Sequence, residues 1–394
     1  MAEWKTYKLS EIATLLTGFP FAGEKYTKEG IRVVRGDNVT IGALRWDSDK
    51  LKCWKEPFVR ADDFSLMSGD VVIGMDGSRV GLNRAQIKES DLPLFLAQRV
   101  ACIRHNEKTI QDFLYYQIFS ERFVKYIKQV QTGTSIPHVS LKQIGDFEIA
   151  LPSLEEQRRI AGILGAIDDK IENNRRINTN LELQTQALYK QWFVDNRSDD
   201  WEVGKVSDYY DITIGKTPPR KEKQWFSNNP KDFVWVSISD MGSCGAYISN
   251  SSEFLTAEAI KRFNIKVIPN NTVLLSFKLT VGRVAISDGV LTTNEAIAHF
   301  NTLNDYLTEY TYLALKAYNF ANLGSTSSIA TAVNSKIIKS MLWVMPNDNV
   351  LRDFHNIVAP FFTQIKNNIR ENETLATLRD TLLPKLMNGE IITK

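Results

Sequence analysis

Two strings in this sequence hold residue types that could do phosphate or methyl-transfer chemistry: GKT at residues 215–217 and NPKDF at residues 229–233. A GxxxxGK[ST] phosphate-binding loop requires a glycine at position 210, but Tyr210 stands there. A methyltransferase motif of the form N/D-P-P-Y/F needs a second proline, which NPKDF lacks, so this string is more typical of a turn before a strand. Neither string predicts a catalytic site.

The residue spacing does not predict metal-dependent chemistry either. The nuclease-like ExK triplet at residues 3–5 has no acidic residue before it. The four histidines have no metal-ligand spacing and the three cysteines form no CxxC pair; they are His105, His138, His299 and His355, and Cys53, Cys102 and Cys244. We expect reduced thiols, no catalytic residue, no metal site and no cofactor on this chain.

The elements around these strings are short strands mixed with helices. Runs rich in Val, Ile and Phe between Gly, Asp and Asn predict strands at residues 31–34, 70–75, 99–103, 233–238 and 272–277. Helices are predicted at 108–130 and 305–318. The fold class is mixed α and β, and the order of the strands is not predicted.

The chain carries an internal repeat, which decides its architecture. Trp4 and Gly18 match Trp201 and Gly215 at an offset of 197 residues, and further matches at 194 residues run to the end of each half. The two halves are copies of one pattern, in which an α/β domain is followed by a long helix. The predicted boundaries are 1–150 and 196–345 for the two α/β domains, and 151–195 and 346–394 for the two long helices.

Each long helix has a heptad seam. Ser153 followed by Glu156 is typical of a helix N-terminus with a capping box. From Ile160 onward, seam residues recur at steps of four and three, and both helices place two asparagines at equivalent seam positions: Asn174 and Asn178 in the first, Asn368 and Asn372 in the second. Polar seam residues fix register, so the two helices are predicted to pair as an antiparallel coiled coil with pseudo-two-fold symmetry.

The bulk composition allows several classes and excludes others. The chain has 394 residues, of which 43% are hydrophobic and 24% charged, as in folded globular proteins. No apolar run is long enough to cross a bilayer and the N-terminus has no signal-peptide core, so we expect a cytoplasmic protein. The net charge of +2 is close to neutral. Any nucleic-acid binding must therefore rely on a local basic surface or on partner subunits.

The string LPSLEEQRRIAGILGAIDDKIENNRRINTNLELQTQALYKQWF at residues 151–193 closely resembles the central conserved region of the specificity subunit of type I restriction–modification systems. GTSIPHVSLKQIGDFEIALP (133–152) is similar to the lead-in found in that family, and NETLATLRDTLLPKLMNGEI (372–391) is similar to its distal end. The resemblance is specific in the helices and weak within the α/β domains.

The resemblance implies an α+β fold in which two globular target recognition domains are separated by the two long helices. It implies a non-catalytic DNA-binding subunit in which each α/β domain reads one half of a bipartite, gapped site. The helices would act as a spacer and as a docking surface for two modification (methyltransferase) subunits. Those would carry S-adenosylmethionine, and separate restriction subunits would use ATP and Mg for translocation and cleavage.

DNA reading needs Lys and Arg for phosphates, and Arg, Asn, Gln, Ser or Thr for base edges. In the first domain the candidates lie in the glycine-rich loop 75–84 and in two further segments: Arg79, Asn83, Arg84, Gln98, Arg99, Thr134, Ser135 and His138. In the second domain they lie in the basic segment 216–225 and in segments 277–283 and 292–296: Lys216, Arg220, Lys221, Lys223, Lys278, Arg283 and Asn294.

Two other classes remain open at this level. The chain could be a coiled-coil adaptor whose two α/β domains bind proteins, or an enzyme with an unrecognised site. Neither the recognised bases nor the gap length can be derived from the sequence.

Overall fold

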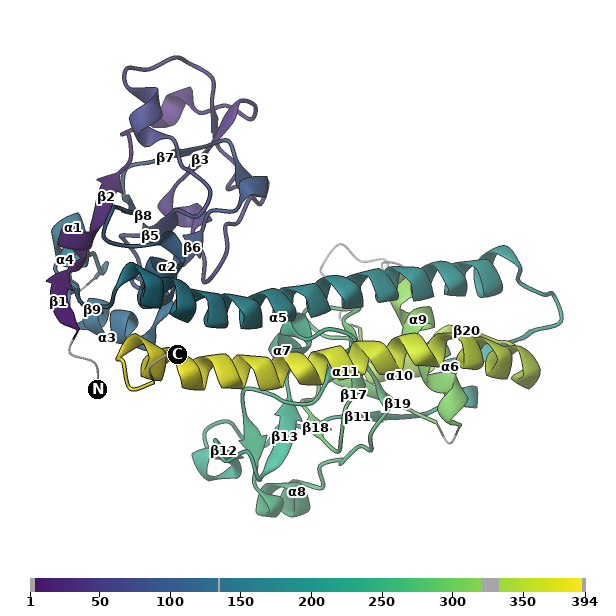
Figure 1. The fold of residues 1–394 in the computed structure, drawn as a ribbon. Coiled ribbons are helices and arrows are strands. Elements are labelled where there is room, and N and C mark those ends of the chain that lie inside the picture. The colour runs from purple at the N-terminus through teal and green to yellow at the C-terminus, as the bar shows by residue number, and fades with distance from the viewer. Residues whose placement is uncertain (1–3, 134, 303, 321–322, 324–332, 392–394) are drawn as a thin grey trace. The chain divides into compact units, whose positions relative to one another are not determined.

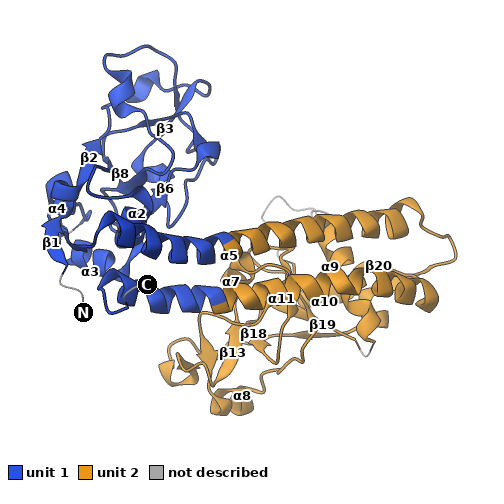
Figure 2. Cartoon of the chain, viewed as in Figure 1, with its two compact units in different colours: residues 1–169, 375–394 blue, residues 170–374 orange. Residues whose placement is uncertain are grey.

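The computed structural model describes residues 4–133, 135–302, 304–320, 323 and 333–391. The chain forms two compact units, one of residues 1–169 and 375–394 and the other of residues 170–374 (Figure 2). Each unit combines short strands, short helices and parts of two long helices (Figure 1). No helix in the described residues is long and apolar enough to cross a membrane.

Three sheets build the first unit. The central one has the order β2-β8-β5-β6 and is antiparallel throughout. In a second sheet of order β4-β3-β7, β3 runs parallel to β7, and the third is the antiparallel pair β1-β9. The strands are β1 (Lys5–Lys8), β2 (Ala13–Thr17), β3 (Ile31–Val34), β4 (Cys53–Trp54), β5 (Val71–Gly74), β6 (Arg84–Gln86), β7 (Leu94–Leu96), β8 (Val100–His105) and β9 (Glu148–Leu151).

The helices of the first unit are α1 (Leu9–Ile12), α2 (Gln111–Phe119), α3 (Glu121–Val130) and α4 (Leu141–Gly145). The single helix predicted for residues 108–130 is therefore two. Ser120 adopts an extended backbone between them, and its hydroxyl accepts a hydrogen bond from the Phe123 amide at 3.2 Å, which caps α3. Apolar residues of α2 and α3, such as Phe113 and Phe123, share one fully buried core with β5 and β8.

The second unit repeats this plan with a longer central sheet of order β11-β19-β16-β17-β14. Its strands are β10 (Glu202–Lys205), β11 (Asp211–Ile214), β12 (Phe226–Ser227), β13 (Phe233–Val236), β14 (Tyr247–Ile248), β15 (Phe254–Leu255), β16 (Val273–Ser276), β17 (Val284–Ser287), β18 (Thr292–Thr293), β19 (Ile297–Asn301) and β20 (Leu342–Met345). Its short helices are α6 (Val206–Tyr209), α7 (Ile238–Ser243), α8 (Ala257–Phe263), α9 (Thr308–Ala317) and α10 (Ser335–Lys339). The strands and the helix predicted here lie within two or three residues of these bounds.

Equivalent glycines show the duplication at the level of single contacts. A side chain on Gly18 would overlap the Leu96 carbonyl oxygen, and one on Gly215 would overlap Thr293 Oγ1. Both glycines let the chain pass directly against a strand, β7 in one unit and β18 in the other. These two strands pair in parallel with β3 and β13 respectively, so the predicted internal repeat is also a repeat of topology.

The two long helices are α5 (Leu154–Tyr189), which continues as a π-helical turn over Lys190–Asp195, and α11 (Asp348–Met387). The amide of Glu156 donates to the Ser153 hydroxyl at 3.3 Å, so the predicted N-terminus of the first helix is correct.

Within each unit the two long helices pack antiparallel. In the second unit Asn174 donates to Asn372 at 3.0 Å, and Asn368 donates to Asn178 at 2.7 Å. In the first unit Arg379 forms an ion pair with Asp168 at 2.8 Å. As the residue number rises along α5 it falls along α11, which confirms the predicted α+β fold with paired antiparallel helices.

Candidate nucleic-acid interface

The first unit has a hollow with a volume of about 780 Å³ at one end of its central sheet. Its walls come from the segment after β2, the turn after β3, the loop between β5 and β6, and the turn between β7 and β8. The residues that line it are Phe19, Pro20, Phe21, Tyr26, Arg35, Gly36, Asp37, Val39, Thr40, Arg45, Asp76, Gly77, Ser78, Arg79, Asn83, Ala97, Gln98, Arg99 and Ile136. We call this surface the concave face.

Strand register explains why four of the predicted candidates meet there. Gly74, at the end of β5, pairs with Val100, at the start of β8. The loop that follows β5 therefore leaves the sheet beside the turn that precedes β8. Arg79 and Asn83 come from the loop, and Gln98 and Arg99 from the turn, so residues about 20 positions apart in sequence line one surface.

The concave face is also more basic than the sequence analysis predicted. Arg35 and Arg45 line it together with Arg79 and Arg99. Three of these arginines pair with an aspartate, Arg35 with Asp37, Arg45 with Asp47 and Arg99 with Asp76. The excess of positive charge suits an anionic backbone, and the amides of nearby asparagine and glutamine suit hydrogen bonds to base edges.

Sequence reasoning missed Arg35 and Arg45. Arg35 follows β3, and the backbone amide of Ala97 donates to the Val34 carbonyl at 3.0 Å, so the end of β3 lies beside the turn before β8. This neighbourhood depends on the parallel pairing of β3 with β7, which local sequence does not reveal. The available signal was an arginine directly after a predicted strand.

Arg84 is the first correction to the predicted set. Its side chain is buried, with only 7% of the residue exposed, and donates to the carbonyl oxygens of Gly81 and Phe119. The guanidinium also stacks on the Phe119 ring at 4.9 Å. Burial lowers the pKa of Arg84 to about 10. Arg84 therefore ties the loop to α2 and is not available to a phosphate.

His138 lies beside the concave face and contacts one of the residues that line it. Its Nδ1 forms a hydrogen bond with Asp76 Oδ1, and the amide of Gly77 donates to the Pro137 carbonyl at 3.0 Å. Ser135 is exposed in the same segment. Thr134 lies outside the described residues.

In the second unit the candidates come from equivalent elements. The Lys216 amide donates to the Thr293 carbonyl at 2.9 Å, which brings the start of segment 216–225 beside Asn294. Lys216 Nζ donates to the Phe263 carbonyl at 2.7 Å, and Asn294 Oδ1 accepts from the Ala296 amide at 3.1 Å. The Lys216 side chain thus ties its segment to the end of α8, and the Asn294 side chain holds its own turn.

Arg220 has several protein partners, although its side chain is 51% exposed. Its Nη1 forms an ion pair with Glu253 at 2.8 Å, and the guanidinium stacks on the rings of Phe226 and Trp235, each at 4.5 Å. A guanidinium paired and stacked in this way contributes to the local fold. Lys221 and Lys223 in the same segment are exposed.

Arg283 is the second correction. Its Nη1 donates to the Ile238 carbonyl at 2.5 Å, and its guanidinium packs so closely against Gly242 that a Cβ added there would overlap it. The tip of the loop is different: Lys278 is exposed, and Leu279 is 99% exposed with a φ of 61°. The exposed tip is the part of loop 277–283 that a large ligand can reach.

In the described part of the chain, no group of three or more His, Cys, Asp and Glu side chains could hold a metal ion. The most perturbed histidine, His299, is buried between Thr213 and Thr293, and burial lowers its pKa to about 4. It lies inside the central sheet rather than in an open site.

The fold and the loops together define a duplicated α+β protein that carries basic and amide side chains on equivalent segments of its two units. The chain belongs to the family described as type I restriction modification DNA specificity domain, which matches residues 1–183 and 198–347. This membership favours DNA recognition over the adaptor alternative.

Curated relatives are similar over most of the chain. The type I restriction enzyme MjaIX specificity subunit of Methanocaldococcus jannaschii is 28% identical over 76% of this chain and 73% of its own length. The HindI specificity subunit of Haemophilus influenzae is 23% identical over 99% of this chain and its full length. A solved type I restriction–modification S subunit from M. genitalium shares the fold, with a TM-score of 0.56 at 17% identity over 97% of this chain and 96% of that one.

Proposed function

We propose that this chain is the DNA-reading specificity subunit of a type I restriction–modification complex, and that each α/β domain reads one half of a bipartite, gapped site. The observation that carries the proposal is the concave face of the first unit. There Arg79, Asn83, Gln98 and Arg99 converge from two loops onto a basic hollow. Arginine and amide side chains on such loops are the groups that distinguish base edges in the major groove.

In the second domain, the proposed contacts are the exposed ends of the equivalent segments. Lys221 and Lys223 would contact phosphates, and Lys278 with its neighbours at the loop tip would approach a groove. Arg220 and Arg283 would keep these segments in place. Gln98, Ser135, His138, Lys216 and Asn294 remain proposed as secondary DNA contacts, because several of their polar atoms already have protein partners.

The long helices would set the spacing between the two readers and dock the other subunits. At 1.5 Å per residue, the 36 residues of α5 and the 40 of α11 correspond to helices of about 54 and 60 Å. Two modification subunits, which bind S-adenosylmethionine, would dock on them, and restriction subunits that use ATP and Mg would join the assembly. The chain itself would be non-catalytic and cytoplasmic.

Co-expression with the modification subunit encoded beside this chain tests the proposal. Genome-wide mapping of methylated bases should yield one bipartite motif with a gap of fixed length. Simultaneous replacement of Arg79, Asn83 and Arg99 with alanine should relax one half of the motif and leave the other half intact. A continuous motif, or an unchanged motif in a triple variant that still co-purifies with its partner, would overturn the proposal.

A further inference from the structure

The concave face contains one arginine whose direction is fixed by a second side chain. Arg99 Nη1 donates to Asp76 Oδ2 at 3.0 Å, and the other carboxylate oxygen of Asp76 is bonded to His138 Nδ1. The three side chains come from three separate segments, the turn before β8, the loop after β5 and the segment before α4. Together they form a hydrogen-bonded group at the edge of the concave face, in which Asp76 holds the Arg99 side chain in place. We call this group the brace.

The backbone at Arg99 is equally well defined. Arg99 has a φ of 74°, in the left-handed region that non-glycine residues rarely adopt. The turn is held by the Gln98 amide, which donates to the Phe19 carbonyl at 2.9 Å, and by the Arg99 carbonyl, which accepts from the Met75 amide at 3.1 Å. Strain of this kind persists only where surrounding contacts over-determine it, and it is common at binding sites.

The brace leaves one edge of the guanidinium available. The side chain of Arg99 is 64% exposed. Among the described residues, its hydrogen bond to Asp76 uses Nη1 alone, so the two parallel donors Nε and Nη2 can meet a ligand. Guanine O6 and N7 present two parallel acceptors in the major groove, and an arginine that meets both is the commonest specific contact in protein–DNA complexes.

The charge of Asp76 makes Arg99 better suited to contact a base than a phosphate. Asp76 neutralises Arg99 locally, and its carboxylate would repel a phosphate brought to the same guanidinium. A neutral pair loses little in hydrogen bonding to an uncharged base edge. Fixed direction and low net charge therefore favour reading a base, whereas Arg79, which is exposed on the same surface, has the free charge that a phosphate needs.

We propose that Arg99 reads a guanine in the half-site of the first domain, with Asp76 as its positioning residue. The inference rests on the proposed DNA-reading function, which it deepens by assigning one base to one side chain.

The test uses the full chain in its complex with the modification subunit and measures kcat/KM for methylation of duplexes carrying the mapped motif. Each guanine of the motif is replaced in turn. The wild-type complex should prefer guanine by about 5- to 150-fold at one position read by Arg99. Arg99→Ala should abolish that preference at that position alone, and Arg99→Lys should reduce it there, because an ammonium group lacks the rigid fork of two parallel donors. Asp76→Asn should weaken the preference at the same position.

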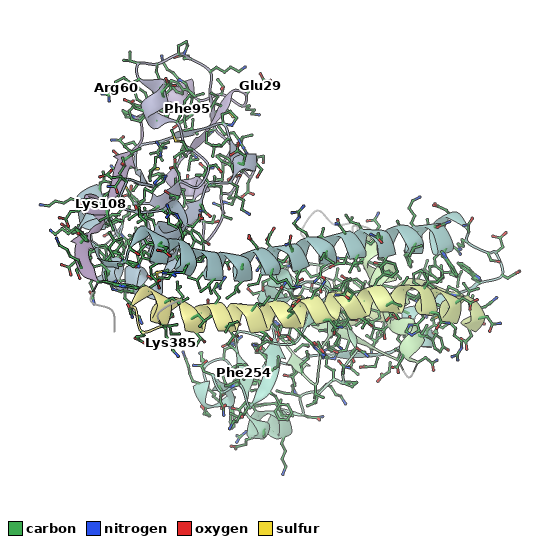
Figure 3. All side chains as sticks on the ribbon, viewed as in Figure 1. Glu29, Arg60, Phe95, Lys108, Phe254 and Lys385 are labelled. Carbon is green, nitrogen blue, oxygen red and sulfur yellow. The ribbon has the colours of Figure 1, made fainter. Side chains whose placement is uncertain are left out.

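A matched control exists in the same unit. Arg60 also has a positive φ, of 60°, and pairs with Asp63, but it does not line the concave face. It lies in the same part of the first unit as Phe95 (Figure 3). Arg60→Ala and Asp63→Asn should leave every preference unchanged.

Three results would overturn the inference while leaving the proposed function intact. The Arg99 variants could lose rate equally on all duplexes and keep the guanine preference, which would indicate a phosphate contact. They could match the wild type, or the half-site that they affect could contain no guanine. Failure of the proposed function itself would instead appear in the wild-type complex as the absence of a gapped motif. If Arg99→Ala does not co-purify with its partner, the guanine preference of Arg99→Lys decides the question, because this variant keeps the charge and the approximate length of the side chain.

Discussion

Asn368 of α11 donates a hydrogen bond to Asn178 of α5 at 2.7 Å, and both residues are almost fully buried. The internal repeat carries Asn178 onto Asn372 and Asn174 onto Asn368. It therefore converts this contact into the one between Asn174 and Asn372, which is present at 3.0 Å. Two polar contacts related by the repeat thus fix the register of an antiparallel helix pair, as seam asparagines do in coiled coils.

Removal of one asparagine of the buried pair should destabilise the chain. Asn178→Ala leaves the Asn368 amide without its acceptor, and we expect a loss of about 1–3 kcal/mol in the free energy of unfolding. Denaturant unfolding of the single variants and of Asn178→Ala/Asn368→Ala gives the coupling between the two side chains. A coupling below about 0.5 kcal/mol would show that the two asparagines do not act as a pair.

The buried carboxylate of Asp288 should make the second unit sensitive to acid. Burial alone would raise the pKa of Asp288, but hydrogen bonds from Arg370 and Lys366, at 2.6 and 3.0 Å, outweigh it and hold the pKa below its ordinary value. A depressed carboxyl pKa contributes stability above the unfolded value of about 3.9, and that contribution is lost as pH falls through the folded pKa.

Asp288→Asn should therefore cost about 1.5–3 kcal/mol at pH 7, because two charge-assisted hydrogen bonds weaken. The difference from the wild type should shrink as pH falls below about 4. Unfolding curves at a series of pH values measure this difference. A deficit that stays constant down to pH 2 would mean that the charge of Asp288 contributes nothing.

His299 should also make the stability of the second unit fall in acid, and at a higher pH than Asp288 does. Its folded pKa is lowered by burial to about 4, whereas an unfolded histidine titrates near about 6.5. Between these values the unfolded chain binds a proton that the folded chain excludes, so stability falls as pH falls. One such proton corresponds to about 1.4 kcal/mol per pH unit. His299→Gln should flatten the slope of unfolding free energy between pH 6 and 5.

His355 provides the opposite sign within the same unit. Its hydrogen bond to Glu309, at 2.8 Å, raises its pKa, so its contribution is present below the unfolded pKa and is lost as pH rises through the folded pKa. His355→Gln should therefore destabilise the chain more at pH 5.5 than at pH 8. Equal slopes for the two histidine variants would contradict at least one of the two assignments.

Particular residues show what local sequence could and could not predict. The asparagine pairs, the Ser153 cap and the match of Gly18 to Gly215 follow from periodicity and repeat, which are properties of the chain itself. The environment of Arg84 depends on Phe119, 35 residues away, and that of Arg35 on the parallel pairing of β3 with β7. The predicted segments supply four residues that line the concave face, whereas tertiary contacts decide which arginines of these segments are buried.

The basic segment 216–225 allows structural and DNA-binding cations to be separated in one experiment. Arg220, Lys221 and Lys223 are all exposed, but Arg220 also stacks on Phe226 and Trp235 and pairs with Glu253. Arg220→Ala should lower the free energy of unfolding by about 1–2 kcal/mol, since cation–π contacts of this kind contribute about that much.

Lys221→Ala/Lys223→Ala should leave the free energy of unfolding unchanged, because exposed lysines contribute little to it. In the complex with the modification subunit, however, the double variant should weaken binding to all DNA sequences. The slope of log K against log salt concentration should become shallower by about 1 for each phosphate that the protein no longer neutralises. If the double variant keeps the wild-type slope while Arg220→Ala changes it without loss of stability, the assignment of these three cations is wrong.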